Sequence, residues 1–144
     1  MTVSASLRRL VFERDGYGCV YCLTTQENSG QPLHIDHIEP TAKGGVTTLD
    51  NLCSCCASCN YHKSAKQVAP DPLTTSLIPL FHPLQQDWQE HFVWDESGTV
   101  IAGLTPCGRA TIVALQMNND LIVRARRRWV EGGWHPPVLS LIHI

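Results

Sequence analysis

Two Cys-x-x-Cys pairs constrain this sequence more than any other feature. Cys19 and Cys22 form one pair, and Cys56 and Cys59 form the other. The short spacing lets both sulfurs of a pair face one ion, so two pairs can supply four thiolates to a tetrahedral zinc. Two disulfides or buried free cysteines are the alternatives. The N-terminal stretch lacks the apolar core of a secretion signal, so we expect a cytoplasmic protein and favour zinc.

The cysteines around the second pair leave its membership open. Cys53-x-x-Cys56 has the same spacing as Cys56-x-x-Cys59, and Cys55 lies between them. Spacing alone therefore does not choose the second pair.

Composition limits the kind of partner. With 144 residues the chain is one domain, or one domain with an extension, and no run is long and apolar enough to span a bilayer. The formal net charge is −2, which counts against a protein that coats nucleic acid through a globally basic surface. Any phosphate contacts would have to be local.

The segment between the two pairs carries polar residues in an ordered pattern. Residues 33–38 alternate apolar and polar, which predicts a strand, and Asp36 and His37 would face opposite sides of a regular strand. A Gly44-Gly45 turn and Asn51 follow, and we predict a helix from about residue 57 to residue 66.

The order of these motifs resembles the HNH endonuclease family. The pair Asp36-His37, then Asn51, then Asn60, framed by the four cysteines, carries the resemblance, which covers about residues 7–66. Asn60 stands where the family name has a histidine. The resemblance implies an α+β fold with a ββα-metal core, places Asp36-His37 where the strand ends before Pro40, and selects Cys56 and Cys59 as the second zinc pair. Cys53 and Cys55 are then small apolar residues, or ligands that exchange with that pair.

The resemblance also implies a chemistry. His37 would be the general base, Asp36 and Asn60 would hold a divalent ion such as Mg²⁺ or Mn²⁺, and Asn51 would brace the loop that carries His37. His62 would be a third ligand or a phosphate contact, and Lys63 would neutralise a phosphate. The zinc would be structural and would tie the first cysteine pair to the catalytic helix.

The rest of the chain is similar to the C-terminal extension of one group of small bacterial HNH proteins. We expect the nuclease core at residues 1–68, a linker at 69–80 and the extension at 81–138. The extension would contain a β-hairpin around residues 92–102 and one long helix from about residue 108 to residue 131. A basic run near the end of that helix has two open interpretations. Its arginines contact DNA phosphates, or they interact favourably with the helix dipole. The run consists of Arg124, Arg126, Arg127 and Arg128.

Three functions are consistent with these patterns. A metal-dependent endonuclease acting on DNA comes first, and a zinc-stabilised nucleic-acid-binding module without cleavage is the alternative. A thiol redox protein rests on the cysteine pairs alone, and zinc ligation would remove its reactive thiol. Residues 139–144 are set apart, because they resemble the translation of an adaptor used in sequencing libraries and are a candidate assembly artefact.

Overall fold

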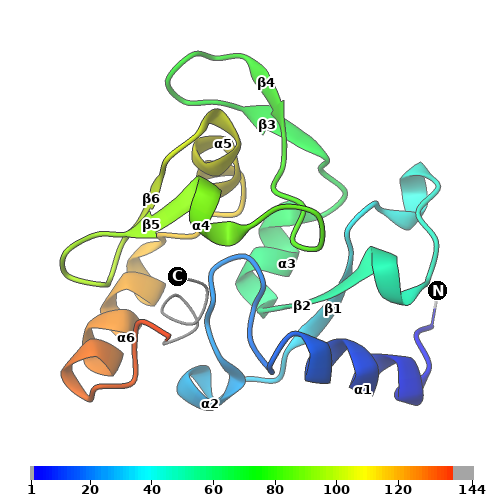
Figure 1. The fold of residues 1–144 in the computed structure, drawn as a ribbon, viewed down its shortest axis with the longest axis horizontal. Coiled ribbons are helices and arrows are strands. Elements are labelled where there is room, and N and C mark those ends of the chain that lie inside the picture. Colours follow the sequence, from blue (N-terminus) through cyan, green and yellow to red (C-terminus); the bar gives the residue numbers. More distant parts are fainter. Residues whose placement is uncertain (1, 138–144) are drawn as a thin grey trace.

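The computed structural model describes residues 2–137, which form short helices and three two-stranded antiparallel sheets (Figure 1). The candidate artefact at 139–144 lies outside the described residues. The helices are α1 (Ala5–Arg14), α2 (Gln26–Ser29), α3 (Ala57–Lys63), α4 (Trp88–His91), α5 (Pro106–Ala114) and α6 (Asp120–Glu131). The strands are β1 (His34–His37), β2 (Leu52–Cys55), β3 (Val68–Pro70), β4 (Leu77–Pro79), β5 (Phe92–Trp94) and β6 (Ile101–Gly103). Within residues 2–137, no helix has the length and apolarity needed to cross a membrane.

The N-terminal half is built around the β1–β2 pair, which α3 follows directly in the chain. His37 pairs with Leu52 and His34 with Cys55 in the antiparallel register. Helix α1 packs against β2, and the Asp15 carboxylate that follows this helix accepts a hydrogen bond from the Ser54 backbone N–H at 2.8 Å. Figure 1 shows this half on the right and α5, α6 and the β5–β6 pair on the left.

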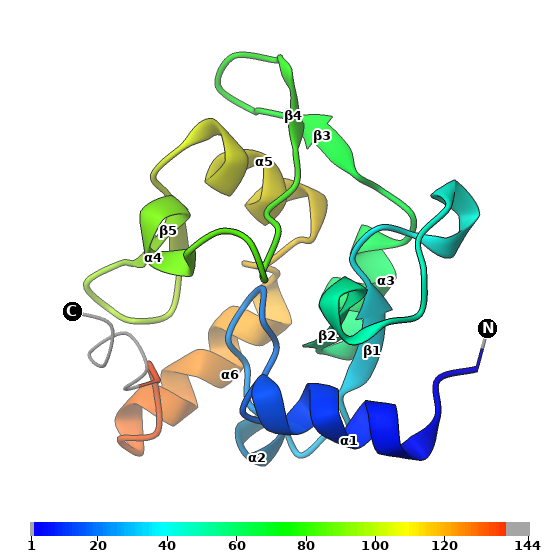
Figure 2. The same ribbon diagram turned by 45° about the vertical axis from the view of Figure 1, so that its right-hand side comes forward.

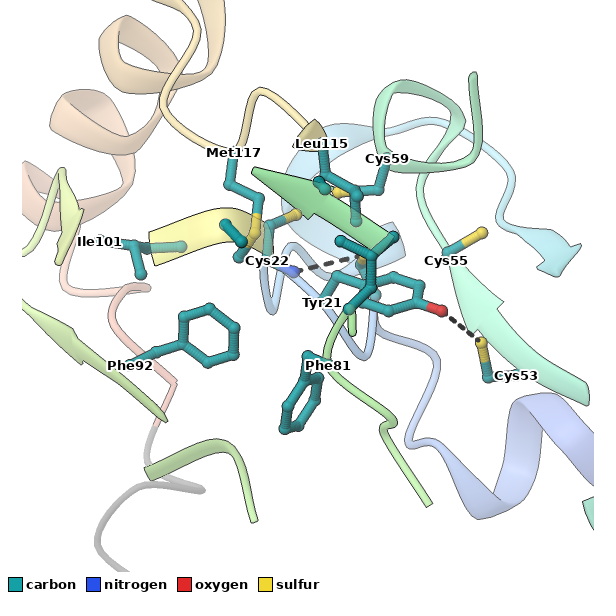
Figure 3. Close-up of a cluster of buried hydrophobic side chains, with 14 of the residues drawn as sticks. Tyr21, Cys22, Cys53, Cys55, Cys59, Phe81, Phe92, Ile101, Leu115 and Met117 are labelled. Carbon is teal, nitrogen blue, oxygen red and sulfur yellow. Dashed lines mark hydrogen bonds between the residues drawn. The ribbon is translucent and has the colours of Figure 1, made fainter. Parts of the chain in front are cut away.

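One buried cluster joins the two halves. It contains the zinc-type cysteines of the N-terminal half and aromatic and aliphatic residues of the C-terminal half, including Phe81, Phe92, Leu115 and Met117. Figure 3 shows Met117 close to Cys22 and Leu115 close to Cys59. Because the same cluster is completed from both halves, burial of its apolar surface stabilises both together.

The segment expected to be a linker is structured. Strands β3 and β4 pair antiparallel, with Ala69 opposite Ile78, and form a hairpin that lies beside α5 (Figure 2). The Asp71 carboxylate in its turn is fully buried and accepts two hydrogen bonds from Arg109 of α5, at 3.0 and 2.9 Å. Prolines at 70 and 72 indicated an open linker, but the paired strands and this ion pair fix the segment to the extension. The division of the chain into separate domains stays a prediction.

The single long helix expected at residues 108–131 is two helices. Helix α5 ends at Ala114, and α6 begins after Asn119, whose side chain accepts from the Ile122 N–H as an N-cap. The break places Asn118 beside Ile101 of β6, where its side chain donates to the Ile101 carbonyl and accepts from the Ile101 N–H, both at 2.8 Å. The single helix was expected because Ile112, Leu115, Ile122 and Trp129 form one apolar stripe in the sequence, and this stripe runs across the break.

Candidate metal centre and catalytic pocket

The four cysteines of the two Cys-x-x-Cys pairs lie together. All four Sγ atoms are within 4.8 Å of one another, and Cys22 Sγ lies 3.7 Å from Cys56 Sγ. Zinc–sulfur bonds of about 2.3 Å in a tetrahedron place two sulfurs about 3.8 Å apart. This geometry fits one zinc ion, and it selects Cys56 and Cys59 as the second pair. The sequence prediction of a four-cysteine cluster is confirmed.

Local backbone geometry pre-orients the sulfurs. The N–H of Cys22 donates to Cys19 Sγ at 3.5 Å, and the N–H of Cys59 donates to Cys56 Sγ at 3.4 Å. Hydrogen bonds from the Cys19, Cys56 and Cys59 thiols lower the pKa of Cys22. The pKa of Cys19 is raised, chiefly by burial, and the pKa of Cys59 is raised, chiefly by hydrogen bonds with the other three cysteines. Only Cys22 is therefore shifted toward the thiolate that zinc binds.

The other two buried cysteines of β2 differ from the four in their surroundings. Burial raises the pKa of Cys53 and of Cys55 well above the ordinary value, so both remain thiols. Neither belongs to the four-sulfur group, and Cys53 Sγ instead lies 3.7 Å from the Tyr21 hydroxyl. These two cysteines are the small apolar residues that the sequence indicated.

Asp36 and His37 are the last two residues of β1, and their side chains have different hydrogen-bond neighbours. Strand β1 continues through His37. The Asp36 carboxylate is buried, accepting from the Tyr21 hydroxyl at 2.9 Å and lying 3.1 Å from the Lys63 ammonium of α3. His37 is half-buried, with its Nε2 3.0 Å from the Thr47 hydroxyl.

Asn51 ties the loop after β1 to the start of β2. Its side-chain amide donates to the carbonyls of Glu39 and Val46, and its side-chain oxygen accepts from the Glu39 N–H at 2.9 Å. Gly45 lies so close to this point that a Cβ there would meet the Glu39 carbonyl oxygen at 1.8 Å. The Gly44-Gly45 turn therefore lets the loop fold tightly onto Asn51 beside His37.

A pocket of about 280 Å³ lies where β1 meets α3, with Asp36, His37 and Asn60 in its lining. The Asn60 side chain also lies 3.3 Å from His34 Nδ1. His34 was not among the site residues that we expected. Its signal in the sequence is the two-residue spacing from Asp36, which places both side chains on one face of β1.

Comparison with known proteins adds one finding. Residues 19–66 match the family model described as HNH endonuclease. This segment is an HNH domain. No curated protein matches the chain, and no solved structure matches it either. The matched residues of the HNH domain contain all four zinc-type cysteines and the pocket residues Asp36, His37 and Asn60.

Two expected phosphate contacts of the HNH domain and the extension are buried. Lys63 is 2% exposed, and its ammonium donates to the backbone carbonyls of His37 and Ile38 as well as to Asp36. Arg126 is 0% exposed. Both cations therefore act inside the protein, and we withdraw them as contacts to a DNA backbone. Their positions in basic stretches of sequence gave no sign of this, because burial depends on the tertiary packing of α3 and α6.

The other candidate contacts remain accessible. Arg124, Arg127 and Arg128 of α6 are exposed, and their spacing places them on one side of the helix. His62 is half-buried, and its Nδ1 lies 2.8 Å from the Ser58 carbonyl oxygen.

The pocket residues fit a hard divalent ion. A carboxylate offers about four lone-pair positions, and in Asp36 most known partners lie on Oδ2, while Oδ1 receives only the Lys63 ammonium at 3.3 Å. Oδ1 therefore has fewer partners than Oδ2 among the described contacts. Carboxylate and amide oxygens beside an imidazole suit Mg²⁺ or Mn²⁺.

Proposed function

We propose that this protein is a metal-dependent HNH endonuclease that hydrolyses DNA phosphodiester bonds. The observation that carries the proposal is the HNH match over residues 19–66, in which His37 shares a pocket with Asp36 and Asn60. A histidine beside hard-ion ligands suits hydrolysis, whereas nucleic-acid binding alone needs neither.

His37 is the proposed general base. An imidazole has an ordinary pKa near neutrality, so it can accept a proton from water at physiological pH. The Thr47 hydroxyl, 3.0 Å from Nε2, fixes the plane of the ring. Asn51 holds the loop that carries this hydroxyl against the start of β2, so it positions His37 without touching the substrate.

Asp36 and Asn60 are the proposed ligands of the divalent ion, and His34 is a further candidate because it lies 3.3 Å from Asn60. When bound, the ion supplies Lewis-acid stabilisation of charge on the phosphate and on the leaving oxygen. Tyr21 and Lys63 hold the Asp36 carboxylate in place from the buried side. A rigid ligand of this kind lowers the cost of organising the site.

DNA is the proposed partner, and the exposed arginines of α6 are candidate phosphate contacts. Arg124, Arg127 and Arg128 form a local cationic patch on a chain whose net charge is −2. A patch of this kind makes affinity depend on salt concentration.

Plasmid cleavage by the zinc-loaded protein tests the proposal. With Mg²⁺ or Mn²⁺ we expect nicked or linear DNA, and His37→Ala should slow cleavage by about 10²- to 10⁴-fold. Asp50→Asn is the matched control, because Asp50 is exposed and its carboxylate bonds only to the nearby Thr48 hydroxyl at 2.5 Å among the described contacts. Cleavage that is equal in the wild type and His37→Ala would contradict the assignment of the base.

A zinc-stabilised nucleic-acid-binding module without cleavage is the second candidate. One observation favours it: Asp36 is 5% exposed and already bonded to Tyr21 and Lys63. A folded, zinc-loaded protein that shifts DNA in a gel but leaves it uncut with either ion would establish this function instead.

A further inference from the structure

Tyr21 lies in the zinc knuckle, the turn of residues 19–22 that begins and ends at a zinc-type cysteine. It is 0% exposed, and its hydroxyl donates to Oδ2 of Asp36 at 2.9 Å. Figure 3 shows the hydroxyl directed at Cys53 of β2, the strand that pairs with β1. One side chain therefore reaches from the four-cysteine cluster to a carboxylate of the proposed catalytic pocket.

The Tyr21 hydroxyl fixes the orientation of the Asp36 carboxylate more strictly than the other neighbours do. The Lys63 ammonium lies near both oxygens, 3.3 Å from Oδ1 and 3.1 Å from Oδ2. The Cys53 thiol lies 3.8 Å from Oδ2, but a thiol is a weak donor. Among the described contacts, the bond from Tyr21 is therefore the short, directional one that holds Oδ2 in particular.

The backbone at Tyr21 is held from both halves of the molecule. The indole Nε1 of Trp88 in α4 donates to the Tyr21 carbonyl at 2.7 Å, and the Trp88 ring packs against Phe92 with centroids 5.1 Å apart. On the other side, the Val20 N–H donates to the Ser54 carbonyl of β2 at 3.0 Å. The position of the zinc knuckle, and with it the position of the hydroxyl, is therefore well defined.

We propose that Tyr21 is a positioning residue that orients Asp36, and with it the divalent ion, from the zinc knuckle. Groups that bond to a metal-binding carboxylate orient it and contribute to the affinity for the ion. Trp88 supports this orientation from the C-terminal extension, because it holds the carbonyl of Tyr21. This role rests on the proposed function, in which Asp36 binds Mg²⁺ or Mn²⁺, and it gives the two metal sites one shared side chain.

Three substitutions test this role. Tyr21→Phe removes the hydroxyl and keeps the ring. Trp88→Phe removes the indole donor and keeps an aromatic ring. Thr111→Val is the matched control, because it also removes a fully buried hydroxyl, one that accepts from the Phe81 N–H at 3.0 Å in the C-terminal half. Zinc is counted by mass spectrometry, and Mn²⁺ binding to the zinc-loaded proteins is then titrated by electron paramagnetic resonance of the free ion.

We expect Y21F to weaken Mn²⁺ binding by about 10- to 100-fold while one zinc per chain is kept. W88F should weaken it by less, because the bond that it removes reaches Asp36 only through the zinc knuckle. T111V should bind Mn²⁺ like the wild type, and Asp36→Asn should remove the binding, which assigns the ion to the pocket. A tyrosine that only packs the core would lower stability and leave the Mn²⁺ affinity unchanged.

Equal Mn²⁺ affinities of the wild type and Y21F, with D36N deficient, would overturn the role of Tyr21 and leave the proposed function standing. A wild type that binds Mn²⁺ no better than D36N would contradict the proposed function, and this role with it. Equal losses in Y21F and T111V would also overturn the role, because any destabilised variant would then bind the ion less well. If Y21F does not fold with zinc, W88F decides: weaker Mn²⁺ binding at full zinc content supports the role, and wild-type affinity overturns it.

Discussion

The two sites proposed to bind metal differ in almost every physical respect. The cysteine cluster is closed, with four ligands of one kind held within 4.8 Å and three of them buried. The pocket at His37 is open to solvent, and its residues offer a carboxylate, an amide and an imidazole. A closed tetrahedral site is typical of structural zinc, and an open site with hard ligands is typical of a catalytic ion.

The two halves of the molecule each contain a buried cation, and the two cations have different partners. At the pocket, the Lys63 ammonium lies 3.1 Å from the carboxylate of Asp36, which is a proposed ligand. In the C-terminal half, the buried Arg126 guanidinium donates to the Thr99 and Met117 carbonyls and lies 5.0 Å from the centre of the Trp94 ring. Both cations are held inside the protein, so basic residues in the sequence do not by themselves mark a DNA surface.

Removal of one zinc ligand should have the largest effect. Cys59→Ser deletes a buried ligand that joins α3 to the first cysteine pair. Binding free energies of structural zinc are about 10–16 kcal/mol, which exceeds the stability of most small domains. We expect no cooperative thermal transition and less than one zinc per chain by mass spectrometry.

Cys55→Ala is the control for that variant. Cys55 is as deeply buried as Cys59 but lies outside the four-sulfur group. It should keep one zinc per chain and a cooperative transition. Loss of zinc in Cys55→Ala would break the distinction between ligand and packing cysteines.

Lys63→Met tests the buried ion pair of the pocket. The substitution leaves Asp36 without its cation, and breaking a buried pair from one side costs about 3–5 kcal/mol. We expect the free energy of unfolding in urea to fall by that amount while zinc content is unchanged. Lys66→Met, at an exposed position three residues further along the chain, should change stability little. Equal stability of the wild type and Lys63→Met would show that water or another group reaches Asp36.

Asn51→Ala separates the proposed effect of Asn51 on the position of His37 from its effect on folding stability. The bonds that it removes lie near the surface, where water can replace them, so we expect a loss of about 1 kcal/mol. Under the proposed function, misplacement of His37 should slow cleavage by up to about 10²-fold. Asn28→Ala removes a comparable side-chain bond, to the Trp134 carbonyl, far from the pocket in sequence. It should leave cleavage unchanged.

The smallest expected effect is the pH dependence of folding stability that His135 causes. His135 is buried against Trp94 and Trp129, and burial, followed by the charge of Arg126, lowers its pKa to about 4. The unfolded chain, with a pKa near 6.5, then binds more protons, so stability falls as pH drops from about 6.5 to about 4. Zinc-loaded His135→Phe should show a smaller fall over this range than the wild type. Parallel curves for the two proteins would contradict a neutral, buried His135.

Cysteine spacing predicted a four-cysteine cluster but left the second pair open. The family resemblance, which residues 19–66 bear out, chose Cys59 over Cys53, and the four-sulfur geometry agrees. The pocket was less predictable. The roles of His37, Asp36, Asn51 and Asn60 stay predictions. His34 was missed because the motifs that carry the family resemblance do not include it.

The remaining errors have a common cause in tertiary packing. The helix break after Ala114 depends on Asn118 meeting Ile101, and the β3–β4 hairpin depends on Asp71 meeting Arg109. Burial of Lys63 and Arg126 likewise follows from contacts between distant segments. None of these contacts leaves a periodic or local signature in the sequence.

The most direct test of the two-site account is to count metals and measure cleavage on the same sample. The protein is desalted into metal-free buffer, its zinc is counted by native mass spectrometry, and plasmid cleavage is followed with and without added Mg²⁺ or Mn²⁺. The account predicts one zinc per chain that survives desalting, no cleavage without added ion, and cleavage that returns when Mg²⁺ or Mn²⁺ is supplied. Cleavage sustained by the zinc-loaded protein alone, or a folded protein that carries no zinc, would contradict it.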